Sequence, residues 1–251
     1  MYNEIATIGP ITIHGYGLMI GIGVMVALIV GDKRAGKRGL NGDMVYGLTI
    51  AAVFFGFLAA RILHIITEFK YFLADPMAYI TGSGFVVFGG IIGGIITVMI
   101  YCKLKGANGF DYIDLMAPSV ALAQGFGRLG CLLAGCCYGR ETTSPLGIVF
   151  TNSHYAPNGV RLIPTQIIMS VGDFIIAAIL LWYASKERKR GQITFMWLGL
   201  YSVGRFFVEF LRNDYRGSVG ILSTSQFIGI LMLIAVVLSF KFLVPVIDKE
   251  K

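Results

Sequence analysis

The chain has 251 residues, of which 56% are apolar and only 14% are charged, and its mean hydropathy is +0.74. Soluble domains carry about 25% charged residues, so this composition argues against a soluble enzyme and favours helices packed in lipid. The net charge of +7 does not indicate nucleic-acid binding, because the basic residues form short clusters between apolar runs, as in loops that face anionic lipid.

Seven apolar stretches are long enough to cross a bilayer as helices, which takes about 20 residues each. In chain order they are 11–31, 44–66, 85–102, 112–134, 164–184, 193–211 and 223–244. The first is expected to remain as a span, because the residues before it lack the basic region and cleavage site of a signal peptide. The sequence therefore predicts an all-α polytopic membrane protein of about seven transmembrane helices, with residues 1–251 forming a single membrane domain.

The lysines and arginines of the connecting loops predict the orientation. Thirteen of them lie in one alternating set of loops, which includes Lys33 and Lys189, and five lie in the other set. The positive-inside rule places the richer set in the cytoplasm. The N-terminus is then outside, the C-terminus is cytoplasmic, and the long loop 136–163 faces outward.

Three arginines interrupt the predicted spans, although an arginine near the bilayer centre costs at least about 2.5 kcal/mol on insertion scales. Arg61 lies in the second span and Arg128 in the fourth. Arg205 lies in the sixth span and shares a helix face with Glu209 and Arg212, because they are four and seven residues further on.

Two interpretations of these arginines stay open. In one, each arginine pairs with a carboxylate that holds the bundle together, as Glu209 is placed to do for Arg205 and Asp114 for Arg128. In the other, they bind an anion, because acids at membrane depth are too few to neutralise all three. Inside a bilayer the abundant anion is a lipid phosphate, whose oxygens match the two-pronged donor geometry of arginine.

The segment 127–139 is the most unusual in the chain, with four glycines in thirteen residues. This density predicts a helix that breaks at membrane depth and lines a cavity, where freed backbone N–H groups bind an anion. A tight helix-packing face, which also requires small residues, is the alternative.

The same segment carries three of the four cysteines, Cys131, Cys136 and Cys137, near the outward face. A disulfide between Cys131 and one of the other two, a low-pKa nucleophile beside Arg128, a soft-metal site and plain packing all remain open. No metal is predicted, because the chain lacks a second Cys or His cluster at standard zinc spacing. Cys102, near the cytoplasmic end of its span, is expected to be packing.

In its motifs the chain resembles the phosphatidylglycerol–prolipoprotein diacylglyceryl transferases over nearly its whole length. The residues that carry the resemblance are Ile8-Gly9-Pro10, His14-Gly15-Tyr16-Gly17-Leu18-Met19, Ala60-Arg61-Ile62, Phe88-Gly89-Gly90, the segment 127–139, Pro164-Thr165-Gln166, and Gly204-Arg205-Phe206 with Glu209-Phe210 and Arg212. The arginine–glycine segment and the last arginine block are the specific ones.

The resemblance implies a multi-pass enzyme of the bacterial inner membrane without a cofactor, whose active site opens toward the outer face. Such an enzyme transfers the diacylglyceryl group of phosphatidylglycerol to the lipobox cysteine thiol of a prelipoprotein and releases glycerol phosphate. A monomer is expected. By resemblance Arg128 and Arg205 hold the phosphate and stabilise the departing charge. The other implied lipid-binding residues are Tyr16, Arg61, Gly139, Glu209 and Arg212.

Departures from the family pattern concern the acceptor. Phe88 stands where the family usually has a histidine, and Cys131 and Cys136 stand where it has an amide and a carboxylate. Cys131 is therefore a further catalytic candidate, and His14 and His64 are candidate substitutes for the histidine. Two other functions stay open: a membrane thiol redox or acyl-transfer enzyme that uses Cys131 and Cys136, and an arginine-lined transporter of anions or small molecules.

Overall fold

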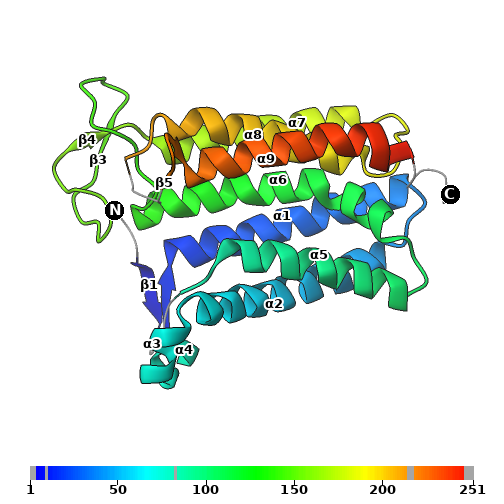
Figure 1. Ribbon diagram of the computed structural model, residues 1–251, viewed down its shortest axis with the longest axis horizontal. Coiled ribbons are helices and arrows are strands. Elements are labelled where there is room, and N and C mark those ends of the chain that lie inside the picture. The colour runs from blue at the N-terminus through cyan, green and yellow to red at the C-terminus, as the bar shows by residue number, and fades with distance from the viewer. Residues whose placement is uncertain (1–3, 9–10, 82–83, 214–217, 246–251) are drawn as a thin grey trace. The chain divides into compact units, whose positions relative to one another are not determined.

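Helices occupy all seven predicted ranges of the chain (Figure 1). The computed structural model describes residues 4–8, 11–81, 84–213 and 218–245. The long helices are α1 (Gly15–Lys37), α2 (Gly42–Thr67), α5 (Val87–Leu104), α6 (Gly109–Ala134), α7 (Thr165–Tyr183), α8 (Gln192–Glu209) and α9 (Thr224–Leu238). Two short helices, α3 (Phe69–Ala74) and α4 (Pro76–Thr81), follow α2, and a π-helical turn, η1 (Ser239–Leu243), continues α9.

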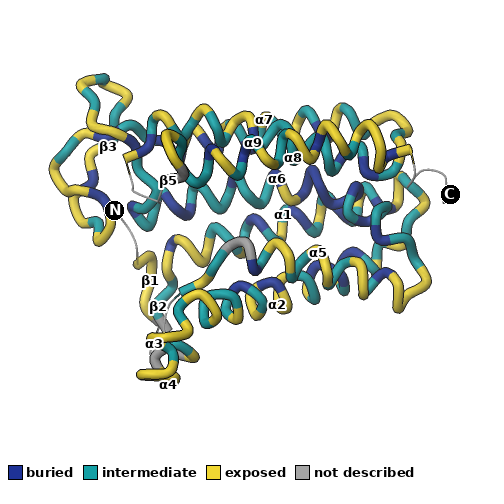
Figure 2. The backbone as a smooth tube through the Cα atoms, in the orientation of Figure 1, coloured by how far each residue is buried: buried dark blue, intermediate teal, exposed yellow. Residues whose placement is uncertain are grey.

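Four of these helices are long and apolar enough to cross a membrane: α1, α2, α7, and α9 together with η1. Within the described residues, α5 offers only a shorter apolar stretch, Gly89–Leu104. Many large apolar side chains are exposed, including Phe54 (63%), Trp182 (75%) and Val237 (65%). Figure 2 shows exposed residues along the helices, interspersed with intermediate and buried ones. Such surfaces suit lipid, whereas the count of seven spans remains a prediction.

Three short antiparallel strand pairs accompany the helices, one before α1 and two between later helices, and none was predicted from the sequence. β1 (Glu4–Ile8) pairs with β2 (Ile11–His14), with Thr7 opposite Thr12. The other pairs are β3 (Ile148–Val149) with β4 (Arg161–Leu162), and β5 (Ser218–Val219) with β6 (Leu222–Ser223).

The chain forms two compact units, and the first consists of Met1–Val30 and Asp114–Lys251. In it α8 packs against both α7 and α9. A buried apolar cluster joins α6, α7 and α8, and comprises Ala117, Ala121, Ala177, Leu180 and Ile193. Close approach of α6 and α7 needs Gly125, because a Cβ there would lie 2.5 Å from the ring of Phe174. Ser170 also donates a hydrogen bond of 2.9 Å to the Gly125 carbonyl.

The second unit, Gly31–Ile113, is built on the packing of α2 against α5. Small residues let the two backbones approach. A Cβ at Gly89 would lie 2.6 Å from the Ala59 carbonyl oxygen and 2.9 Å from the Ala60 Cα. This is the packing expected of helices in lipid, where van der Waals contact replaces the hydrophobic effect. The single membrane domain stays a prediction from the sequence.

The predicted break in the glycine-rich segment is wrong for residues 127–134, because α6 runs without interruption to Ala134. The helix-packing alternative is correct at Gly130, where an added Cβ would lie 3.1 Å from the Tyr16 ring and 3.3 Å from the Tyr16 carbonyl oxygen. Gly130 thus lets α1 lie against α6. The helix ends at Gly135, whose φ of +73° suits glycine.

The suggested pair of Asp114 with Arg128 is also wrong. Asp114 accepts hydrogen bonds from the backbone N–H groups of Gly191 (2.7 Å) and Thr194 (2.9 Å) at the start of α8. The carboxylate thereby satisfies orphan donors of a helix N-terminus, where a negative charge is favourable.

Candidate active site

Arg128 projects from α6 and contacts a side chain of α8. Its Nη2 donates a hydrogen bond of 3.2 Å to the hydroxyl of Tyr201. Asp173, a buried aspartate in the middle of α7, lies within electrostatic reach of Arg128, and its Oδ2 has no hydrogen-bond partner among the residues that the structure describes. Among the described residues, no carboxylate forms an ion pair with Arg128. Its charge is therefore available to an anion.

Arg205 pairs with Glu209, as their spacing predicts. Arg205 Nη1 lies 2.8 Å from Glu209 Oε2, and the two side chains are only 11% and 9% exposed. Arg205 Nη2 also donates a hydrogen bond of 3.0 Å to Ser225 at the start of α9. Arg128 and Arg212 both lie within electrostatic reach of Arg205. Positive charge is therefore concentrated around Arg205.

Arg212 follows α8 and is buried. Its Nη1 lies 3.8 Å from the Met169 sulfur, and its backbone forms a bridge with Gly139. Gly139 has no room for a side chain, because a Cβ would lie 2.6 Å from the Ile163 carbonyl oxygen and 2.8 Å from that of Leu211. Gly139 therefore lets three backbone segments meet and positions Arg212 beside Arg205.

Tyr16, at the first turn of α1, lies within electrostatic reach of Arg128 and of Cys131, Cys136 and Cys137. The first unit thus brings together most of the predicted site: Tyr16, Arg128, Gly139, Arg205, Glu209 and Arg212. Sequence reasoning missed Asp173, Tyr201 and Ser225. An aspartate inside a strongly apolar helix was the available indication for Asp173, whereas Tyr201 and Ser225 carry none.

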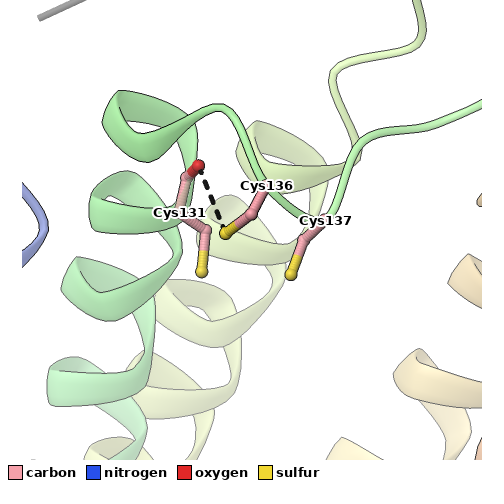
Figure 3. Close-up of side chains that lie close together, drawn as sticks. All are labelled: Cys131, Cys136 and Cys137. Atoms are coloured by element: carbon pink, nitrogen blue, oxygen red, sulfur yellow. Dashed lines mark hydrogen bonds between the residues drawn. The ribbon is translucent and has the colours of Figure 1, made fainter. Parts of the chain in front are cut away.

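Cys131, Cys136 and Cys137 cluster where α6 ends, and Figure 3 shows their three side chains together on one side of the turn. Their Sγ atoms all lie within 4.8 Å of one another. None of the three forms a disulfide within the described part of the chain, and the Cys136 thiol points at the Cys131 carbonyl oxygen, at 3.7 Å. Hydrogen bonds with Cys131 and Cys136 lower the pKa of the Cys137 thiol well below its usual range, and Arg212 lowers it further.

The start of α7 holds this turn in place. Thr165 Oγ1 donates a hydrogen bond of 2.7 Å to the Cys137 carbonyl, and Gln166 Nε2 donates one of 2.8 Å to the Cys136 carbonyl. Both side chains are fully buried, with Thr165 at 0% and Gln166 at 1% exposure. The motif Pro164-Thr165-Gln166 thus positions the cysteines.

Arg61 belongs to the second unit, where it contacts backbone. Its Nη1 donates a hydrogen bond of 2.7 Å to the Gly84 carbonyl, and its guanidinium lies 5.4 Å from the Phe85 ring centre. In the same unit His64 stacks on Tyr79 with ring centres 5.6 Å apart. Phe88 lies in the first turn of α5, and its side chain is outside the described residues.

His14, the other candidate substitute for the family histidine, lies in the first unit and ends strand β2 with an exposed side chain. The structure therefore brings the arginines and the cysteines together, but it leaves His14 at the surface.

Comparison with known proteins gives the family. The chain matches the prolipoprotein diacylglyceryl transferase family over residues 3–241. It is 48% identical, over 223 residues, to the phosphatidylglycerol–prolipoprotein diacylglyceryl transferase of Clostridium tetani (strain Massachusetts / E88), covering 88% of this chain and 90% of the relative. The chain belongs to the prolipoprotein diacylglyceryl transferase family.

Two further relatives of this family agree. The phosphatidylglycerol–prolipoprotein diacylglyceryl transferase 2 of Clostridium perfringens (strain 13 / Type A) is 51% identical over 91% of this chain and 90% of its own length. The Dehalococcoides mccartyi relative is 34% identical over 93% of this chain and 90% of its own length. The chain is thus a transferase of lipoprotein biosynthesis and a membrane protein, as the motifs indicated.

Proposed function

We propose that this chain transfers the diacylglyceryl group of phosphatidylglycerol to the lipobox cysteine thiol of a prelipoprotein and releases glycerol phosphate. The observation that carries the proposal is the gathering of three arginines, Arg128, Arg205 and Arg212, within electrostatic reach of one another, while Arg128 forms no ion pair among the described residues. Such an excess of positive charge in a dry environment requires an anion, and the head-group phosphate of the lipid supplies it.

In this reaction the acceptor sulfur attacks the glyceryl carbon that bears the phosphate ester. A carbon–sulfur bond forms, the carbon–oxygen bond breaks, and the oxygen leaves with glycerol phosphate. Negative charge grows on the leaving phosphate, so preorganised cations lower the barrier. Arg128 and Arg205 donate hydrogen bonds to the phosphate in this proposal. Each guanidinium is already oriented by a neutral hydroxyl, that of Tyr201 for Arg128 and that of Ser225 for Arg205.

The other predicted residues have supporting roles in the proposal. Glu209 fixes the orientation of Arg205, and Arg212 adds positive charge. Tyr16 lines the lipid site from α1, and Gly139 makes room for the backbone that carries Arg212. Arg61, in the second unit, has a supporting role in which it holds the turn before α5.

The proposal includes a place in the cell. Seven spans with the N-terminus outside put the cysteine turn and the start of α7 at the outer face of the bacterial inner membrane, where a secreted prelipoprotein arrives. The distribution of thirteen loop cations against five supports this orientation. We further propose that the chain acts as a monomer.

Glycerol phosphate release tests the reaction directly. Purified protein in mixed micelles would be given phosphatidylglycerol with a labelled head group, together with a lipobox peptide or the same peptide with serine in place of cysteine. Release that depends on the cysteine peptide, with matching formation of a thioether-linked peptide, is expected. Absence of release with either peptide, from a protein that binds the lipid, would contradict the proposal.

Cysteine accessibility tests the orientation. Single cysteines would be placed at Asn158 and Lys189 in a background without the four native cysteines. An impermeant thiol reagent should label position 158 in intact cells and label position 189 only after lysis. Labelling of position 189 in intact cells would overturn the proposed topology.

A further inference from the structure

The cysteine cluster has the geometry of a site for a single metal ion. Three sulfurs within 4.8 Å of one another come from one helix end and the turn that follows it (Figure 3). Zinc–thiolate bonds are about 2.3 Å long, so two sulfurs on one tetrahedral ion lie about 3.8 Å apart. The observed separations of up to 4.8 Å are thus close to the spacing that one ion requires.

The backbone of the turn is shaped to present two adjacent cysteines together. Neighbouring side chains of an extended chain point to opposite sides. Cys137 instead adopts a left-handed conformation with φ +64°, which is costly for a residue with a side chain. Hydrogen bonds from Thr165 and Gln166 to the Cys137 and Cys136 carbonyls hold this conformation. The thiol arrangement is therefore imposed by surrounding structure.

The charges around the cluster suit an anionic complex. Three thiolates on a divalent ion carry a net charge of −1, which is costly in a buried setting unless cations compensate. Arg212 contacts Cys137, and Arg128 lies within electrostatic reach of Cys131 and Cys137. A zinc–thiolate complex at this turn would thus be neutralised by arginines already in place.

We propose that Cys131, Cys136 and Cys137 bind a Zn²⁺ ion, whose fourth coordination position receives the acceptor thiol. The inference rests on the proposed function, because it concerns how that acceptor is activated. Sulfur ligands favour soft and borderline ions over Mg²⁺ or Ca²⁺, and zinc with three protein ligands keeps one position open. It revises the expectation of no metal from the sequence, since one turn supplies three ligands without a second cluster.

Activation of the acceptor thiol by zinc is a deprotonation, and it needs neither an oxidant nor a reductant. When the acceptor thiol coordinates zinc, it loses its proton to water, because a coordinating thiol is deprotonated. The bound thiolate attacks the glyceryl carbon, the carbon–oxygen bond breaks, and glycerol phosphate leaves with the electron pair. The product thioether is a weaker ligand than a thiolate, so it departs and leaves the position open for the next acceptor.

Metal content after anaerobic purification with one equivalent of Zn²⁺ tests the site. The parent chain and Cys102→Ser are expected to retain about one zinc per chain after desalting. Cys131→Ser, Cys136→Ser and Cys137→Ser should bind zinc at least tenfold more weakly. Cys102 is the matched control, because it is a buried free cysteine of the other unit. Equal zinc in the parent and the three variants would overturn the proposal, as would binding of Cu(I) without Zn²⁺.

Protection from alkylation is measured on the parent chain, so the result does not depend on whether a variant folds. Zinc should slow alkylation of Cys131, Cys136 and Cys137 at least tenfold, as read by peptide mass spectrometry under native conditions, and leave the rate at Cys102 unchanged. Unchanged alkylation of the three cysteines would overturn the site. Loss of two mass units under non-reducing conditions, from zinc-treated protein, would show a disulfide and would overturn it as well.

The open position is tested with Co²⁺ in place of zinc. A lipobox peptide with cysteine should strengthen the thiolate-to-cobalt charge-transfer absorption, and the serine peptide should not. No spectral change with the cysteine peptide would overturn the role of the fourth position.

Transfer assays separate this inference from the proposed function. Zinc-loaded protein should release glycerol phosphate at least tenfold faster than zinc-free protein. Equal release by both would overturn the inference and leave the function intact. Zinc binding without release, in the presence of lipid and peptide, would contradict the function and leave the metal site standing.

Discussion

The arginines of the two units look alike in the sequence and differ in what they contact. Arg61 donates to a backbone carbonyl, that of Gly84, and lies near an aromatic ring. Arg128 and Arg205 instead contact side chains of other helices, namely Tyr201 and Ser225. A carbonyl contact holds local backbone in place, whereas hydroxyl contacts between helices orient a guanidinium and leave its remaining donors for a ligand.

This contrast has a chemical consequence that substitution by lysine can measure. An ammonium is able to donate one hydrogen bond to a carbonyl, but it cannot reproduce the planar fork that grips a phosphate. Lysine should therefore be tolerated at Arg61 and fail at the arginines of the first unit.

The largest effect is expected from Arg128→Ala. Arg128 forms no ion pair among the described residues, so its removal deletes a hydrogen-bond donor to the phosphate without breaking an ion pair there. The activation barrier should rise by about 2–4 kcal/mol, which lowers turnover roughly 30-fold to 1,000-fold. Membrane insertion should be normal. Glycerol phosphate release measures the loss.

The matched control for Arg128 is Arg188→Ala. Arg188 packs over the Tyr183 ring at 3.8 Å, on the side of the chain predicted to be cytoplasmic, and should retain turnover within about twofold. Near-normal turnover in Arg128→Ala would remove Arg128 from the site and erase the contrast with Arg61.

The second effect in size is expected from Arg205→Lys. The variant keeps the charge near Glu209 but loses the simultaneous contact with Ser225. The activation barrier should rise by about 1.5–3 kcal/mol and turnover should fall accordingly, because the hydrogen bonds lost involve a charged donor. Ser225→Ala serves as the control, with a smaller loss of about 1 kcal/mol. Full activity in Arg205→Lys would mean that charge alone suffices there.

A smaller effect is expected from Arg61→Ala. Loss of the hydrogen bond to the Gly84 carbonyl should lower the free energy of unfolding by about 1.5 kcal/mol. Arg61→Lys should restore most of it, since one donor is enough. Unfolding midpoints in detergent micelles give the comparison. If lysine fails at Arg61 as it does at Arg205, the two arginines have the same role and the contrast between the units is lost.

The helices were predictable from the sequence, but most hydrogen-bond partners of the buried charged side chains were not. Hydropathy located every long helix because lipid exposure requires long apolar stretches, whatever the tertiary arrangement. The hydroxyl partners of Arg128 and Arg205 lie 73 and 20 residues away, on other helices, so packing alone determines them, whereas the pair of Arg205 with Glu209 followed from helical spacing. Asp114 shows the same limit, because Gly191, whose backbone N–H donates to it at the start of α8, is 77 residues away in the chain.

The helix break predicted from the glycines of segment 127–139 was wrong for a physical reason. A glycine both weakens a helix and lets another backbone approach, and composition does not distinguish the two. At Gly130 the contact with Tyr16 compensates for the weaker helix, whereas at Gly135 the chain turns. The short hairpins escaped prediction because strands of two residues, such as β3 and β5, have no periodicity.

The smallest effect is expected from Thr165→Val, which tests how the cysteine turn is held. Valine has nearly the same shape, and it lacks the hydroxyl that donates to the Cys137 carbonyl at 2.7 Å. A buried carbonyl then loses its partner, so the free energy of unfolding should fall by about 0.5–1.5 kcal/mol. Because the strained backbone of Cys137 is held less firmly, alkylation of its thiol should also change rate. Thr165→Ser keeps the hydroxyl and is the control. Should valine and serine variants match the parent in stability and in alkylation of Cys137, the turn is held by packing alone, and Thr165 has no part in presenting the cysteines.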